Sequence, residues 1–121
     1  MNKDETRQNY LEAIHILNKQ KGNVRAIDIC EYLGFSRPTV SVAIRQLKEE
    51  GYIDIVDNFI ALRNKGLKEA EMIYERHEIL AHILMDLGVD EEIAYQDACK
   101  VEHYLSKESF AAIKEAYKSH K

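Results

Sequence analysis

Residues 26–50, AIDICEYLGFSRPTVSVAIRQLKEE, decide the fold of this chain. The first eight predict a short helix, and Gly34 closes it because glycine tolerates the left-handed backbone of a helix end. Ser36 is a suitable N-cap for a second helix, and Pro38 in its first turn needs no backbone donor there. Residues 37–50 then place three apolar side chains at helical spacing: Val40, Ile44 and Leu47. A short helix, a tight turn and a helix are typical of a helix-turn-helix.

The flanking segments extend this motif. Upstream, residues 6–20 predict a helix from apolar Tyr10, Leu11, Ile14 and Leu17. Downstream the apolar period switches to two, so residues 52–56 and 59–62 predict short strands. Asp57-Asn58 joins them, a dipeptide that tolerates tight hairpin turns. This order of elements indicates a winged helix-turn-helix.

The second half predicts three more helices, at about 66–87, 91–104 and 107–119, with Gly88 ending the first and Asp90 and Ser106 capping the others. An apolar stripe on the last helix, formed by Phe110, Ile113 and Tyr117, predicts a partner subunit, because no further chain covers it. The sequence therefore predicts a mainly α protein, with a winged helix-turn-helix domain at 1–65 and a helical domain at 66–121.

Composition narrows the class of protein. Hydrophobic residues make up 45% and charged residues 31%, as in an ordinary globular protein. No apolar run is long enough to span a membrane, and the charged N-terminus lacks the apolar core of a secretory signal. Cys30, which we assign to the core, and Cys99 form no disulfide framework. A cytoplasmic protein is expected.

The net charge of −4 is unevenly distributed. Residues 1–65 hold ten Lys and Arg against nine Asp and Glu, and residues 66–121 hold seven against twelve. DNA binding needs only a locally basic face, and an acidic half suits a cation site.

The second helix of the helix-turn-helix carries side chains suited to DNA. Hydroxyls near a helix N-terminus suit phosphate oxygens, and Arg reaches phosphate or the guanine edge. Apolar side chains there suit the methyl group of thymine. A capped helix with a solvated charged face explains each residue separately about as well, but the whole motif favours double-stranded DNA. The candidate DNA-binding residues are Ser36, Arg37, Pro38, Thr39, Ser41, Val42 and Arg45.

The run DACKVEH, residues 97–103, holds potential metal ligands at helical spacing. Cys99, Glu102 and His103 would share one face of a helix, and His77 lies on another predicted helix. Each has an ordinary alternative: a core histidine, a buried cysteine, a surface Glu–His pair. The spacing alone leaves metal binding and packing open. A ligand cluster behind a DNA-binding motif suggests that a metal ion controls DNA binding.

Four stretches carry a resemblance to a known family: NYLEAI at 9–14, SRPTVS at 36–41, ERHEIL at 75–80 and DACKVEHYLS at 97–106. In this order and spacing, the chain resembles the diphtheria toxin repressor and manganese transport regulator family of metal-dependent repressors. The resemblance implies a homodimer that binds a palindromic operator controlling metal homeostasis genes, when iron(II) or manganese(II) occupies a site between the two domains. The protein would not be an enzyme.

The resemblance also implies a ligand set. His77, Glu102 and His103 match positions shared across the family. Cys99 matches the iron branch, which has Cys where the manganese branch has Glu, and Glu12 matches a manganese-branch ligand. Asn9 stands where the iron branch has Met and the manganese branch has Asp. Ala81 and Tyr95 replace residues of an accessory site in iron-branch relatives.

Ligand chemistry ranks the metals. A thiolate with imidazole and carboxylate suits iron(II) better than manganese(II), so we expect iron(II) first, manganese(II) next and zinc(II) third. Two other functions stay open: a winged-helix regulator without metal control, and a small metal enzyme. The enzyme leaves the helix-turn-helix unexplained and offers no general base outside the ligand set.

Overall fold

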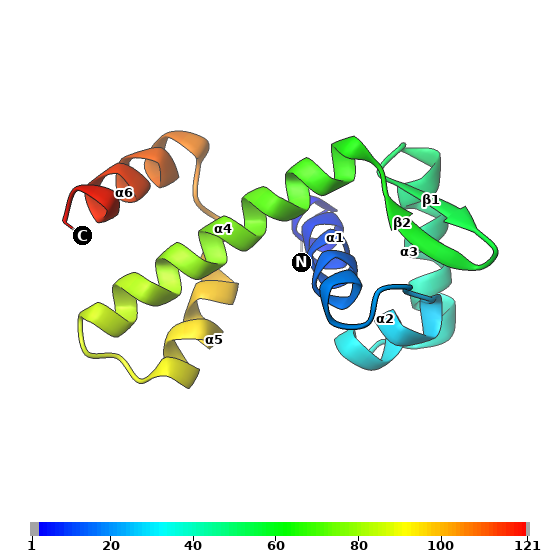
Figure 1. Ribbon diagram of the computed structural model, residues 1–121, viewed down its shortest axis with the longest axis horizontal. Coiled ribbons are helices and arrows are strands. Elements are labelled where there is room, and N and C mark those ends of the chain that lie inside the picture. The colour runs from blue at the N-terminus through cyan, green and yellow to red at the C-terminus, as the bar shows by residue number, and fades with distance from the viewer. Residues whose placement is uncertain (1–2, 121) are drawn as a thin grey trace. The chain divides into compact units, whose positions relative to one another are not determined.

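The computed structural model describes residues 3–120 and contains six helices and one two-stranded sheet (Figure 1). The predicted mainly α architecture with a winged helix-turn-helix is confirmed. In chain order the elements are α1 (Lys3–Lys21), α2 (Ala26–Leu33), α3 (Arg37–Glu49), β1 (Ile53–Val56), β2 (Phe59–Leu62), α4 (Asn64–Asp86), α5 (Glu91–Val101) and α6 (Lys107–Ser119). The chain divides into two compact units, a first unit up to Glu71 and a second from Met72 onward, and the division falls within α4.

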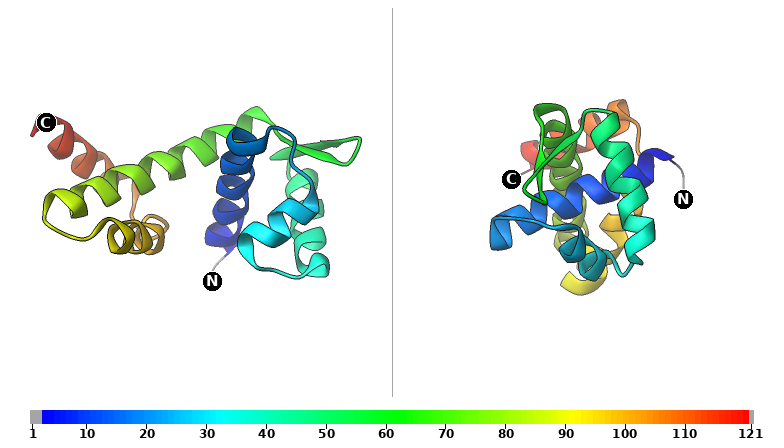
Figure 2. Two further views of the ribbon diagram at one scale, coloured as in Figure 1. Left: turned by 60° about the horizontal axis from the view of Figure 1, so that its bottom comes forward. Right: turned by 90° about the vertical axis from the view of Figure 1, so that its right-hand side faces the viewer.

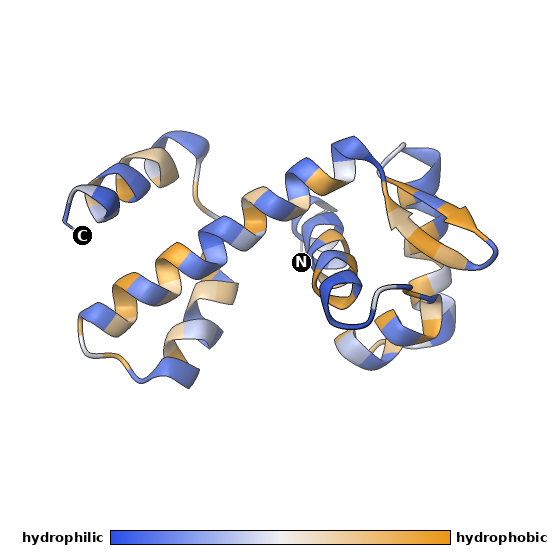
Figure 3. Ribbon diagram, in the orientation of Figure 1, coloured by the Kyte–Doolittle hydropathy of each residue, from blue (hydrophilic) through white to orange (hydrophobic). Residues whose placement is uncertain are grey.

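One apolar core holds the first unit together. The three N-terminal helices and the hairpin contribute to it, and both strands are largely hydrophobic (Figure 3). The hairpin contacts both α1 and α3 (Figure 2). The predicted apolar stripes are buried in this core, as is Cys30: Tyr10, Leu11, Ile14 and Leu17 of α1, and Val40, Ile44 and Leu47 of α3.

The turn between α2 and α3 follows the predicted chemistry. Gly34 has a positive φ of 73°, and its N–H donates to the Cys30 carbonyl at 2.9 Å. Ser36 then caps α3, because its Oγ accepts a hydrogen bond from the Thr39 N–H at 3.3 Å. These two local devices fix where α3 begins.

A two-residue turn joins β1 and β2, which pair in antiparallel fashion. Val56 pairs with Phe59 next to the turn, and Ile53 pairs with Leu62 at the far end. Asp57 and Asn58 have φ values of 52° and 67°, the left-handed region that a tight hairpin turn of this kind requires. The first strand begins at Ile53, one residue later than expected, because the Tyr52 N–H donates to the Leu47 carbonyl at the end of α3.

The start of α4 approaches the backbone at Tyr52 closely. The Arg63 N–H donates to the Tyr52 carbonyl at 2.9 Å. Gly66 is buried at this contact, and a Cβ atom there would lie 2.3 Å from the same carbonyl oxygen. The absence of a side chain at residue 66 therefore lets α4 begin against the hairpin.

The second unit is built on a seam of small side chains. Ala81 of α4 and Ala94 and Ala98 of α5 are fully buried and pack together. Alanines let two helix backbones approach closely, because their side chains occupy little space. Asp90 and Ser106 cap α5 and α6 as predicted. Among the described residues, no helix combines the length and apolar character needed to cross a membrane.

Two predicted features of the second unit are wrong. The helix expected to run to residue 104 ends at Val101, and residues 102–104 form a turn. Phe110, expected on an exposed stripe, is buried at 6% exposure with the Arg76 guanidinium 5.2 Å from its ring centroid. The stripe that stays partly accessible on α6 comprises Ile113 and Tyr117.

We expect Gly66→Ala to lower the free energy of unfolding by about 1–3 kcal/mol, since the added methyl group must displace the Tyr52 carbonyl. The usual effect in a helix is opposite, a gain of about 0.5–1 kcal/mol. Urea unfolding followed by circular dichroism measures the change. Lys68→Ala, at an exposed position of α4, is the control and should change stability by less than about 0.5 kcal/mol. A more stable Gly66→Ala protein would contradict the close contact.

Candidate functional site

The exposed face of α3 is the candidate DNA-binding surface. The residues predicted to contact DNA are all solvent-exposed, while the other face of the helix is buried in the core. Val42 is 57% exposed, although it is apolar. The Ser36 and Thr39 hydroxyls lie 2.8 Å apart at the helix N-terminus. Hydroxyl, guanidinium and methyl groups thus share one accessible surface, as the reading of a DNA groove requires.

A second candidate site lies in the second unit, where α4 and α5 meet. His77 of α4 lies four residues before Ala81, and Cys99 directly follows Ala98 in α5. The close alanine contact between these helices therefore brings His77 toward the end of α5. Ligand atoms of His77, Cys99 and Glu102 all lie within 4.8 Å of one another.

A buried carboxylate forms the centre of this cluster. The Glu102 side chain is 0% exposed; its Oε2 lies 3.0 Å from His77 Nδ1, and its Oε1 lies 3.3 Å from His103 Nε2. The His103 side chain is 2% exposed. Burying an ionised carboxylate is costly unless positive charge or hydrogen bonds compensate for it. Glu102 and His103 are therefore not a surface pair.

Cys99 is the accessible member of the cluster. Its thiol side chain is exposed, so a packing role for this cysteine is wrong. It lines a shallow pocket with His77 and Tyr95. A thiol at the open side of a cluster is reachable from solvent while the carboxylate behind it is shielded.

Arg76 shapes the site, and its role was not predicted from the sequence. It is 5% exposed, and its Nη1 donates to the backbone carbonyls of Glu102 at 3.0 Å and Leu105 at 2.8 Å. Arg76 therefore binds two carbonyls of the segment that follows Val101, where the Tyr104 N–H donates to the Val101 carbonyl in a turn. The sequence pointed to Arg76 only through its position directly before His77 in ERHEIL. An arginine in a helix is expected on the surface, so its burial could not be predicted.

Tyr95 borders the cluster. Its ring centroid lies 5.2 Å from that of His77, and its hydroxyl donates to Glu78 Oε2 at 2.9 Å. Burial and the Glu78 hydrogen bond together raise the pKa of Tyr95 to about 12. The phenol therefore stays protonated near neutral pH and acts as a hydrogen-bond donor to Glu78. Ala81, the other replaced accessory position, is buried in the seam.

The donor set fits a divalent transition metal. Thiol, imidazole and carboxylate are the three main classes of transition-metal ligand in proteins. Glu102 Oε1 is buried and makes no hydrogen bond among the described residues, so it keeps a lone pair for coordination. His103 adjoins Glu102 but is not one of the three residues whose ligand atoms gather most closely.

The two remaining candidate ligands belong to α1 in the first unit. Glu12 is buried at 8% exposure, and Asn9 is half-buried. They lie one turn apart on the same helix, at i and i+3, so their side chains share one face.

Comparisons with known proteins match most of this chain. The family model for the N-terminal DNA-binding domain of iron-dependent repressors matches residues 4–58, and the model for their metal-binding and dimerisation domain matches residues 63–121. The transcriptional regulator MntR of Escherichia coli is 36% identical over 106 residues, which cover 87% of this chain and 68% of the relative. The MntR of Bacillus subtilis is 34% identical over 108 residues, covering 88% and 75%.

A solved structure gives the same answer for the fold. A manganese-dependent transcriptional repressor in complex with manganese superposes with a TM-score of 0.81 at 28% identity. The match covers 93% of this chain and 52% of that repressor, so the chain spans about half of its length. The predicted resemblance is confirmed. The chain therefore belongs to the iron-dependent repressor family, whose members are metal-dependent transcriptional repressors and not enzymes.

Proposed function

We propose that this protein represses transcription of metal homeostasis genes by binding a palindromic DNA operator as a homodimer, in response to iron(II) or manganese(II). Residues 1–65 would bind DNA, and residues 66–121 would supply most of the metal ligands and form the dimer. The observation that carries the proposal is the fully buried Glu102 carboxylate between two imidazoles, with an exposed thiol beside it. A site of this kind has its charge balanced when a divalent cation binds.

The proposed ligands are Asn9, Glu12, His77, Cys99, Glu102 and His103. A bound cation would supply positive charge to the Glu12 and Glu102 carboxylates and bonds to side chains of both units. Arg76 holds the turn that carries Glu102 and His103, so these ligands are preoriented. In the proposed site, the Glu12 and Glu102 carboxylates would repel each other when no cation is bound. A ligand shifts an equilibrium between two arrangements only by binding one of them more tightly.

The choice of metal rests on two observations that point in different directions. Cys99 supplies a thiolate, which favours iron(II) over manganese(II). The relatives at 34–36% identity are named as MntR regulators, and the superposed repressor is described as manganese-dependent. We propose iron(II) first, manganese(II) second and zinc(II) third.

Binding to duplex DNA tests the proposal. An operator is selected from a random duplex library with the metal-loaded protein, and its affinity is then titrated by fluorescence anisotropy under anaerobic conditions. Parallel titrations use iron(II), manganese(II), zinc(II) and a chelator. Metal should raise the affinity and chelator should abolish the gain. Equal affinity with chelator would indicate a regulator without metal control, and failure to select any duplex would exclude a DNA-binding function.

We expect Arg37→Ala and Arg45→Ala to weaken operator binding and to leave metal affinity unchanged, since both side chains are exposed on α3. If Arg45 contacts a phosphate, its loss should weaken binding to all sequences alike and reduce the slope of affinity against salt by about one. Anisotropy at several salt concentrations measures both effects. Parental affinity in both variants would contradict the assigned surface.

We expect Cys99→Ala to weaken iron(II) and cobalt(II) binding by about tenfold or more. Mutating a residue that only hydrogen-bonds a metal ligand already lowers metal affinity by about that factor. The sulfur-to-cobalt charge-transfer absorption should also disappear. Cys99→Glu should shift the preference toward manganese(II), because a hard ligand replaces a soft one. Cys30→Ala is the control, since Cys30 is buried in the core of the first unit. Unchanged cobalt absorption in Cys99→Ala would remove Cys99 from the ligand set.

We expect the protein to be a dimer in solution even without metal. An apolar groove in the second unit is lined by Ile83, Leu87, Ile113 and Tyr117, and Leu87 is 76% exposed. Leu87→Glu should produce monomers at micromolar concentration in sedimentation experiments. Val56→Glu, at the 63% exposed position of the hairpin, is the control and should remain dimeric. A monomeric parent protein would refute the assignment.

A further inference from the structure

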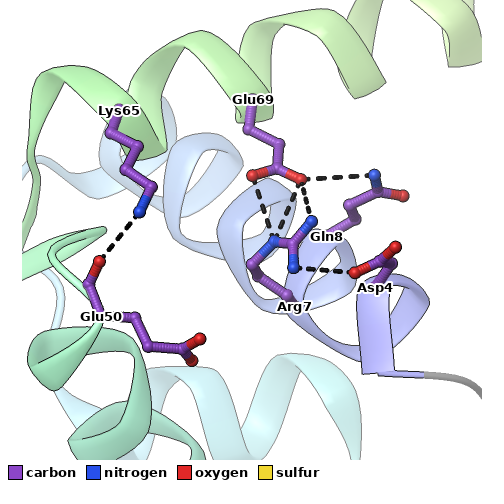
Figure 4. Close-up of polar contacts among 6 residues, drawn as sticks. All are labelled: Asp4, Arg7, Gln8, Glu50, Lys65 and Glu69. Atoms are coloured by element: carbon purple, nitrogen blue, oxygen red, sulfur yellow. Dashed lines mark hydrogen bonds and ion pairs between the residues drawn. The ribbon is translucent and has the colours of Figure 1, made fainter. Parts of the chain in front are cut away.

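A group of charged side chains connects the start of α1 to α4 within the first unit (Figure 4). Arg7 Nε lies 3.1 Å from both Glu69 carboxylate oxygens, and Arg7 Nη2 lies 2.7 Å from Oε1. Arg7 Nη1 donates to Asp4 at 2.9 Å, and the Gln8 amide donates to Glu69 at 3.3 Å. The guanidinium therefore engages both carboxylate oxygens rather than one.

This ion pair is stronger than an ordinary surface contact. The Arg7 and Glu69 side chains are only 20% and 15% exposed, so solvent screens them less than an exposed pair. The hydrogen bonds and charge of Glu69 hold the pKa of Arg7 above its usual range, against the opposing effect of burial. The Arg7 guanidinium also lies 5.3 Å from the Tyr52 ring centroid, a cation–π contact.

Arg7 also lines a small cavity between α1 and α3. The α3 side of this cavity includes Ala43, Gln46 and Leu47. Arg7 thus contacts Glu69 of α4 and the Tyr52 ring before the hairpin, and it lines a cavity that α3 also borders.

The position of Arg7 within α1 gives the pair its significance. Residues 4–9, DETRQN, contain no apolar side chain, and the first residue of α1 in the core is Tyr10. Terminal helical turns without apolar anchors open most readily. Asn9 belongs to this segment, whereas Glu12 lies in the buried part of the helix.

We propose that Arg7 and Glu69 are positioning residues for the metal response. Their ion pair holds the first turns of α1, with the proposed ligand Asn9, against α4 before metal binds. Metal then does not have to order this segment, so binding occurs at a lower metal concentration. The proposal rests on the proposed function, because it requires metal binding that involves Asn9.

The test measures metal affinity in Arg7→Ala, Glu69→Gln and the double variant by calorimetric titration with manganese(II) chloride and cobalt(II) chloride. We expect each single change to weaken binding about fivefold or more, the lower end of typical coupling between sites. The double variant should be no weaker than either single one, because both remove the same interaction. Lys21→Ala is the matched control: it removes the ion pair of Lys21 with Asp28, which joins α1 to α2 and does not involve α4.

A purely structural pair gives a different result. It would lower the thermal midpoint of the metal-free variants and leave the metal dissociation constant unchanged, and that outcome overturns the proposal. In an Asn9→Ala background, Arg7→Ala should have no further effect on metal affinity; a persisting fivefold loss would also overturn it. If the parent protein binds no metal, the proposed function fails as well. If parent and variants bind metal equally, only the positioning role fails.

Discussion

The fully buried Glu102 carboxylate is the central constraint on how α4 meets the end of α5 in the second unit. A carboxylate removed from water needs compensating charge or hydrogen bonds. Two imidazole nitrogens lie 3.0 and 3.3 Å from the Glu102 oxygens. The alanine seam between α4 and α5 makes this arrangement possible, because it brings His77 opposite the end of α5. Arg76 keeps the carbonyl of Glu102 in a turn instead of a helix. Cysteine binds a transition metal as the thiolate, so metal binding at Cys99 would release the thiol proton.

Most of the fold was predictable because local signals specify it. Gly34 and Ser36 mark the turn between α2 and α3, and both adopt the conformations that their residue types favour. The hairpin likewise follows from an apolar period of two interrupted by Asp57-Asn58. The exposure of the α3 surface follows from the same helical period that buries Val40, Ile44 and Leu47. Each of these predictions depends on residues within a few positions of one another.

The errors and omissions arise where distant residues act. The helix expected to reach residue 104 stops at Val101, where the Tyr104 N–H donates to the Val101 carbonyl in a tighter turn. Arg76, twenty-six positions before Glu102, binds the Glu102 carbonyl of this turn. Phe110 is buried instead of lying on the predicted exposed stripe, because the Arg76 guanidinium lies over its ring. The pairing of Arg7 with Glu69 spans sixty-two positions and has no sequence period. For the candidate metal site, spacing identified Cys99, Glu102 and His103, with His77 on a second helix. The close grouping of His77 with Cys99 and Glu102, and the burial of Glu102, came only from the structure.

The alanine seam also separates the packing of α4 against α5 from the choice of residue at position 99. Ala81, Ala94 and Ala98 are completely enclosed, so a larger side chain at any of them would push the helices apart and disturb the whole unit. Cys99, directly beside the seam, is exposed, so we expect substitutions there to disturb the helix packing little. During evolution, a lineage is therefore free to exchange the residue at position 99 in a single step without first acquiring compensating stability. The three buried alanines are therefore constrained by packing, while the exposed residue at position 99 is not.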